Sequence, residues 1–120
     1  MNLDQLRQFC LSLPGTTEDF PFDADTLAFR IGGKIYLLSD IQHFASVNLK
    51  CDPEKAMELR ERHHSVKPGF HMNKKHWNTV EIPGDYTDAM LESWIRHSYD
   101  LVKAGLPLSI RQSLSQSGSL

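Results

Sequence analysis

The segment from Lys67 to Thr79 contains the residue types that proteins use to contact nucleic acids. Lysines, histidines, asparagines and a tryptophan follow one another closely within it. Phosphates bind cations, whereas bases bind hydrogen-bonding groups and flat aromatic faces. We therefore predict weak, largely non-specific DNA binding through this basic, aromatic loop, with contacts from Lys34, Lys67, His71, Asn73, Lys74, Lys75, His76, Trp77 and Asn78.

Each residue type would take a separate role in such a surface. We assign phosphate contacts to Lys74 and Lys75, base-edge or sugar contacts to Asn73 and Asn78, and stacking to Trp77 or His71. A purely structural interpretation stays open beside this one. An aromatic side chain at the start of a strand usually packs inward, which favours packing for Trp77 and also for Phe70.

The charge distribution favours this segment over the rest of the chain. The net charge is −2, which argues against a general polyanion binder. Between Arg60 and Asn78, however, five basic residues and one acidic residue give +4, so the remaining residues sum to −6. If three or four basic side chains contact phosphates, the logarithm of the binding constant should fall with the logarithm of salt concentration with a slope of roughly −3.

Six histidines suggest a metal site, but their spacing argues against one. His63 and His64 are adjacent on a predicted strand, where neighbouring side chains point to opposite faces. The five-residue step from His71 to His76 matches neither the histidine pairs nor the Cys-x-x-Cys clamps that bind zinc. We expect no metal ion.

Catalytic machinery is not indicated either. Cys10 is expected beside the apolar face of the first helix and Cys51 before an acidic helix start, so both are predicted to be reduced packing residues. The chain has no Gly-x-Ser-x-Gly elbow, phosphate-cradling glycine loop or dinucleotide fingerprint, so we expect no cofactor. The carboxylates between Glu18 and Asp25 are expected in a solvated loop, and Ser98 is expected to bond to the backbone of its own helix. A binding role is therefore favoured over an enzyme.

A small α+β domain is expected to position these residues. Apolar periodicity, capping residues and turn signals predict a helix over 2–13, strands over 26–31, 34–39 and 43–50, a helix over 52–62, strands over 64–68 and 77–82, and a helix over 87–105. The order is α-βββ-α-ββ-α, and its connections are of the hairpin type, as at Gly32-Gly33. We therefore predict two layers, a mostly antiparallel five-stranded sheet covered by helices.

The segment from Lys67 to Val80 also has the residue order of a known family. Over about residues 1–105 the chain resembles the MmcQ/YjbR family of small bacterial proteins. The other matching stretches are Leu13 to Glu18, Pro21-Phe22, Gly33 to Tyr36, Leu49 to Glu54 and Ser98 to Val102. The resemblance implies a fold of the secretion-chaperone-like kind with this element order, and a proposed DNA-binding role through a paired wing-like arrangement.

Length and hydropathy bound the organisation of the chain. Its 120 residues predict one domain over 1–112, followed by a flexible serine-rich tail over 113–120. The apolar runs are too short to span a bilayer and the first residues lack a signal-peptide pattern, so we expect a cytoplasmic protein without membrane contact. Whether it is a monomer or a homodimer stays open.

Two other functions stay open. A protein–protein adaptor is one, because the fold implied by the resemblance also serves chaperones that present a sheet face or a dimer interface. A small-molecule binder is the other, with its pocket beside His71, Asn73, His76 and Trp77. The exposure and orientation of residues 67–79 distinguish these functions.

Overall fold

A six-stranded antiparallel sheet dominates the structure, a computed structural model that describes residues 1–118 and side chains as far as Leu114. The helices are α1 (Leu3–Ser12), α2 (Pro53–Arg62), α3 (Asp88–Ala104) and α4 (Leu108–Gly118). The strands are β1 (Thr16–Asp19), β2 (Thr26–Ile31), β3 (Lys34–Asp40), β4 (Ser46–Lys50), β5 (Val66–Pro68) and β6 (Trp77–Glu81). They lie in the order β1-β2-β3-β4-β6-β5. The predicted α+β class with an antiparallel sheet is confirmed.

The predicted number of strands was too low by one, because β1 lies in the stretch that we predicted to be a solvated loop. It pairs with β2 along its whole length as an edge strand. A strand without apolar residues carries no alternating hydrophobic signal, so the sequence pattern does not reveal it. Arg7 binds Glu18 and Arg30 binds Asp19, so two of the predicted loop carboxylates are held in ion pairs on this strand.

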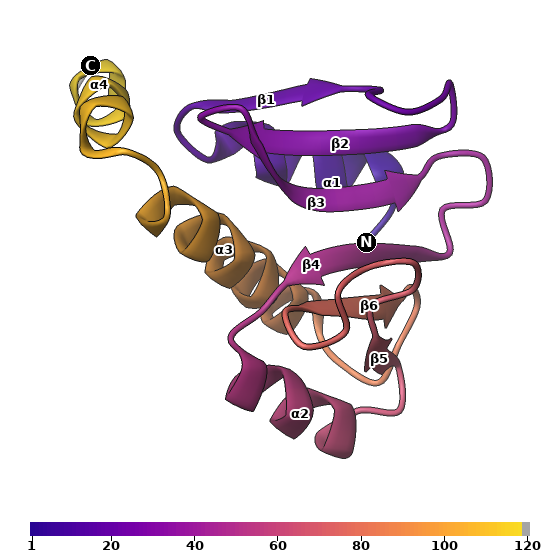
Figure 1. Cartoon of the computed structure of the whole chain (residues 1–120). Helices are drawn as coiled ribbons and strands as arrows, with labels where there is room; N and C mark the ends of the chain where they lie inside the picture. Colours follow the sequence, from indigo (N-terminus) through magenta and orange to yellow (C-terminus); the bar gives the residue numbers. More distant parts are fainter. Residues whose placement is uncertain (119–120) are drawn as a thin grey trace.

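Helices α1 and α3 cover one face of the sheet, whereas the loop between β5 and β6 lies over the opposite face (Figure 1). Helix α1 begins with a capping box between Asn2 and Gln5 and buries Leu6 and Cys10. Helix α3 presents a longer buried stripe, formed by Leu91, Trp94, Ile95, Ser98, Tyr99 and Val102. We call the side of the sheet away from these helices the helix-free face.

Ser98 links α3 to the centre of the sheet. Strands β3 and β4 share only two registered residue pairs, so their backbone groups have few partners in each other. The fully buried Ser98 hydroxyl donates to the carbonyl oxygen of Tyr36 in β3 and accepts from the backbone N–H of Lys50 in β4 at 2.9 Å. The predicted bond to its own helix was therefore wrong, because two strand groups compete for the same hydroxyl.

Helix α4 packs against two glycine turns beside the sheet. A Cβ atom at Gly15 would lie 2.7 Å from Leu114 of α4, and one at Gly32 would lie 2.5 Å from Leu106, just before α4, and 3.2 Å from Ile110 within it. Both glycines also have positive φ angles, 78° and 57°, which favour glycine. The helix extends into the predicted tail as far as Gly118, and residues 119–120 lie outside the described part of the chain. The flexibility of the tail stays a prediction.

Candidate ligand-binding groove on the helix-free face

The strand register brings one row of side chains onto the helix-free face. Ala28, Leu38, Asn48, Thr79 and Lys67 are successive partners across five adjacent strands, so their side chains share a face. The residues beside them in each strand point toward the helices. The middle of this row forms the floor of a groove.

This groove has a volume of about 640 Å³ and is open to solvent. Its walls include Phe22, which precedes β2, and Phe70, from the loop between β5 and β6; they are 68% and 67% exposed. Trp77 also lines it and is half-buried. The remaining lining residues are Ile35, Leu38 and Met72, which are apolar, and Thr26, Ser39, Asp40, Ser46, Asn48 and His71, which are polar. We call this site the sheet-face groove.

The loop over the groove, Gly69 to His76, is held by hydrogen bonds to its own ends and to the sheet. The backbone N–H of Phe70 donates to Oγ1 of Thr79 at 2.8 Å, and the Nζ of Lys74 donates to the carbonyl oxygen of Gly69 at 3.0 Å. Oδ1 of Asn73 accepts from the backbone N–H of Lys75 at 2.9 Å. Because the loop is fixed at several points, its side chains are presented in a preformed arrangement.

At two positions of the loop, the backbone geometry restricts which residue types can be accommodated. His71 has a φ angle of 57°, the left-handed region that non-glycine residues rarely adopt. Gly69 lies so close to Trp77 that an added Cβ would stand 2.8 Å from the Cβ of the tryptophan. The close approach at Gly69 and the turn at His71 together direct Phe70 and His71 outward, where their ring centroids lie 4.1 Å apart.

Arg60 connects the loop to α2. Its Nε donates to Oδ1 of Asn78 at 2.7 Å, and its guanidinium also donates to the backbone carbonyl oxygens of Lys74 and Trp77. From its residue type and position Arg60 was expected to contribute only a positive charge. Its spacing carries no signal for this role, because the partners lie on another element.

The predicted lysines do not form one basic patch. The ammonium group of Lys67 pairs with Glu81 at 3.1 Å on the neighbouring strand. Lys34 begins β3 at the hairpin turn and does not line the sheet-face groove. Of the four lysines, only Lys74 and Lys75 belong to the loop that walls the groove, and both are exposed.

The other predicted site residues divide between the groove and the frame of the domain. His71 and Trp77 line the groove. Asn73 shapes the loop through its side chain, and the carbonyl oxygen of His76 accepts from the backbone N–H of Cys51 at 2.8 Å. Asn78 is 2% exposed and lies on the helix-covered side, so its side chain is not part of the groove surface.

The inward packing that we favoured for two aromatic residues was wrong. Trp77 alternates with Asn78 along β6, and it is the asparagine that faces the helices. Phe70 is two-thirds exposed at the top of the loop. Phe22 and Asn48 were not predicted as site residues. The alternation of residues 43–50 puts Asn48 on the polar side of its strand, and Phe22 entered only through the Pro21-Phe22 pair of the family pattern.

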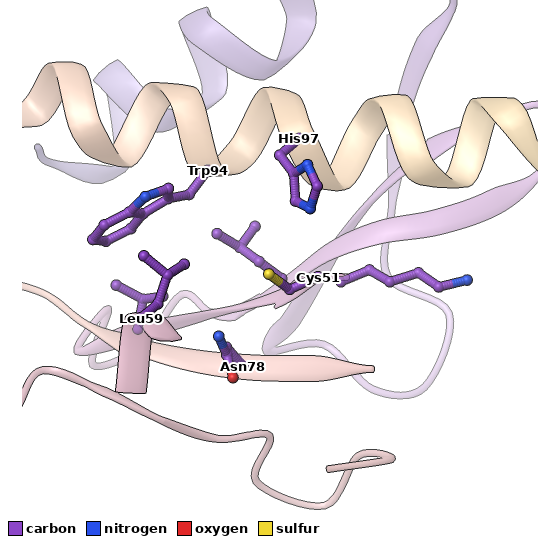
Figure 2. Close-up of a pocket in the computed structure, with 8 residues that line it drawn as sticks. Cys51, Leu59, Asn78, Trp94 and His97 are labelled. Carbon is purple, nitrogen blue, oxygen red and sulfur yellow. The ribbon is translucent and has the colours of Figure 1, made fainter. Parts of the chain in front are cut away.

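A second, much smaller cavity lies beneath α3. Figure 2 shows His97 projecting from the helix toward Cys51 and Trp94 projecting from the same helix on the side of Leu59, with Asn78 below them. Its volume is about 10 Å³, room for about one water molecule. Burial raises the pKa of the Cys51 thiol to about 11 and lowers the pKa of His97, whose Nε2 accepts from the backbone N–H of Asp52 at 3.2 Å. A protonated thiol in a cavity of this size is a packing group and not a nucleophile.

No helix within residues 1–118 is long and apolar enough to cross a membrane. The same residues contain no group of three or more histidine, cysteine, aspartate or glutamate side chains that could hold a metal ion. The sheet-face groove is thus the site on which we base function.

Comparison with known proteins places this architecture among small bacterial proteins. The chain is 39% identical over 101 residues to the uncharacterised protein YbdF of Escherichia coli O157:H7, covering 83% of each chain. It is 29% identical to the uncharacterised protein YjbR of Escherichia coli K12, covering 97% of this chain and 99% of that one. The crystal structure of Deinococcus radiodurans protein DR2400, a DUF419 domain, matches with a TM-score of 0.88 at 41% identity, covering 95% of this chain and 88% of that chain.

A crystal structure of a Pseudomonas syringae protein also matches, with a TM-score of 0.72 and 27% identity, covering 85% of this chain and 99% of that chain. The sequence model of the YjbR family matches residues 11–101, which include every strand of the sheet and the loop that walls the groove. The chain therefore belongs to the YjbR family, as the Lys67 to Val80 segment had indicated.

Proposed function

We propose that the protein binds DNA weakly and with little sequence preference, through the sheet-face groove and the loop from Gly69 to His76. The proposal includes the cytoplasmic location predicted from the sequence, where DNA is accessible. The observation that carries it is that the loop which places Phe70 beside Trp77 in the groove lining also carries the exposed Lys74 and Lys75. Stacking on aromatic rings and contacts between phosphates and lysines are the two interactions that sequence-tolerant nucleic-acid binders combine.

Acidic side chains near the groove limit the affinity that we expect. Asp40 lines the groove, and Glu81 is the partner of Ser46, another lining residue. Phosphate attraction therefore depends on a small number of lysines. We expect dissociation constants typical of non-specific complexes, roughly 10⁻⁴–10⁻⁶ M at physiological salt.

Fluorescence anisotropy of a labelled DNA oligonucleotide, titrated in single-stranded and in duplex form at about 50 mM salt, tests this proposal. The wild-type protein should raise the anisotropy of at least one form. Reversing both loop charges, with Lys74→Glu and Lys75→Glu, should abolish that rise. Lys75→Glu alone should weaken the rise, and Arg96→Glu, the same single charge reversal at an exposed position of α3 away from the helix-free face, should bind as the wild type does. Unchanged anisotropy of both forms at low salt would refute DNA binding.

A small-molecule binder is the second candidate, and the size of the groove supports it. A volume of about 640 Å³ lies within the range of roughly 300–1,000 Å³ that ligand pockets occupy. Its aromatic walls and its polar floor would suit a flat ligand with a few hydrogen-bonding groups. Fluorescence titration with the dye 1-anilinonaphthalene-8-sulfonate, in the wild type and in Phe70→Ala, measures whether a small aromatic molecule binds in the groove. Dye binding that Phe70→Ala leaves unchanged would argue against this function.

A further inference from the structure

The two ends of the sheet-face groove differ in charge. The register pairs Trp77 with Lys50 and Glu81 with Ser46, so the groove runs along β4 and β6 from a Trp77 end to a Ser46 end. Lys75 and Lys74 lie two and three residues before Trp77 in the chain, in the loop from Gly69 to His76. At the other end lies Asp40, which lines the groove, whereas the charge of Glu81 there is balanced by Lys67. A polyanion lying along the whole groove would be attracted at one end and repelled at the other.

A ligand that suits this charge pattern is anionic at one end and flat and uncharged at the other. The Trp77 end offers aromatic faces from Trp77 and Phe70, which line the groove, and cations from Lys74 and Lys75, which are exposed on the adjoining loop. On the floor, Oδ1 of Asn48 accepts from the hydroxyl of Thr79, which leaves the amide N–H groups of Asn48 without an acceptor among the described residues. A nucleobase could stack on the rings and accept a hydrogen bond from this amide, while its phosphate lies at the lysines.

We infer that the groove binds one nucleotide unit whose base is unpaired, with the base between Phe70 and Trp77 and the phosphate at Lys74 and Lys75. This inference rests on the proposed DNA-binding function and specifies the form of DNA that is bound. A duplex keeps its bases paired and stacked inside the helix, so it could reach the lysines but not the aromatic faces. The nucleotide unit can come from a single strand or from a free mononucleotide, which present the same chemistry.

A three-arm titration separates these sources. Anisotropy is measured for a fluorescein-labelled single strand and for its duplex, and unlabelled deoxycytidine monophosphate is added as a competitor of the single strand. We expect the single strand to bind about tenfold more tightly than the duplex, since one stacked base contributes about that factor. We also expect the mononucleotide to displace the strand.

Each other outcome has a distinct meaning. Equal binding of the duplex would overturn the inference while the DNA-binding proposal stands. If neither form of DNA binds but calorimetry detects binding of deoxycytidine monophosphate, the DNA-binding proposal is overturned while the inferred nucleotide unit stands. Absence of binding in all three arms would overturn both.

Phe70→Ala tests the stacking contact without endangering the fold, because this side chain is 67% exposed. The variant should lose about tenfold in affinity for the single strand and leave duplex binding unchanged. Phe20→Ala is the matched control, since Phe20 is 47% exposed but lines a different hollow beside α1. An equal loss in both variants, or no loss in Phe70→Ala, would overturn the inferred position of the base.

Discussion

Nε of Arg60 donates a hydrogen bond of 2.7 Å to Oδ1 of Asn78, which joins α2 to the buried side of β6. The same guanidinium donates to the carbonyl oxygens of Lys74 and Trp77, at the two ends of the last turn of the loop. A single side chain thus satisfies a buried amide and fixes the segment that carries the candidate lysines. This relationship explains how a polar residue can occupy a core position next to the groove.

Replacing Arg60 should therefore destabilise the domain. In Arg60→Ala the buried Oδ1 of Asn78 loses its donor, and an unsatisfied buried acceptor costs about 1–3 kcal/mol in the free energy of unfolding. Urea denaturation followed by circular dichroism measures this loss. Arg62→Ala, two residues further on the same helix, removes only an exposed pair with Glu58 and should change stability by less than about 0.5 kcal/mol. Equal effects of the two substitutions would contradict the assigned role of Arg60.

Ser98 supplies a second stability prediction. In Ser98→Ala the carbonyl oxygen of Tyr36 and the backbone N–H of Lys50 lose their shared partner inside the protein, so we expect a loss of about 1–3 kcal/mol. Ser93→Ala is the control on the same helix, because the Ser93 hydroxyl bonds to the carbonyl oxygen of Met90 at an exposed position. Urea midpoints of the two variants that differ by no more than the error of measurement would contradict the proposed bridge between β3 and β4.

The arrangement of the elements could be predicted because capping residues and apolar periodicity act locally. Asp52 before Pro53, for example, marks the start of α2, and the Asp52 side chain does accept from the backbone N–H of Lys55. The face on which Trp77 lies could not be predicted in this way. In β6 the apolar residues Trp77 and Val80 fall on opposite faces, so alternation alone does not say which face is buried.

The groove was less predictable than the elements for a similar reason. Its walls include Phe22 and Phe70, which are far apart in the sequence and line one groove only because the strands beside them, β2 and β6, belong to the same sheet. Asn78, by contrast, has the composition of a surface residue but is buried because Arg60 reaches it from α2. The groove walls and the burial of Asn78 both depend on contacts between separate elements, about which a single sequence carries no information.

Asp85 should make stability depend on pH in the acid range. Hydrogen bonding with Ser65 lowers the pKa of the Asp85 carboxyl from its ordinary value of 3.8 to about 2. A carboxyl whose pKa is lower in the folded state stabilises that state above its unfolded pKa, and this contribution is lost as the pH falls through the folded pKa. The gap in unfolding free energy between wild type and Asp85→Asn should therefore shrink as the pH falls from about 4 to about 2. Urea denaturation at each pH measures the two free energies of unfolding. A difference between them that stays constant from about pH 4 to about pH 2 would contradict the role of the Asp85 carboxylate.

The salt dependence of DNA binding should be shallower than the sequence suggested. Of the four lysines predicted to contact DNA, only Lys74 and Lys75 belong to the loop that walls the sheet-face groove, since Lys67 pairs with Glu81 and Lys34 lies at a hairpin turn. Two phosphate contacts to a single strand give a slope of about −1.4 for the logarithm of the binding constant against the logarithm of salt concentration, in place of roughly −3.

Anisotropy titrations at several salt concentrations measure this slope and assign it to residues. Lys75→Glu should bring the slope to about −0.7 or nearer to zero, since one phosphate contact is lost and a repulsive charge replaces it. Lys34→Glu makes the same change of charge outside the groove, so its slope should equal that of the wild type. A wild-type slope near −3, with Lys34→Glu and Lys75→Glu equally affected, would mean that phosphates spread over the whole predicted surface and are not gathered at the Trp77 end of the groove.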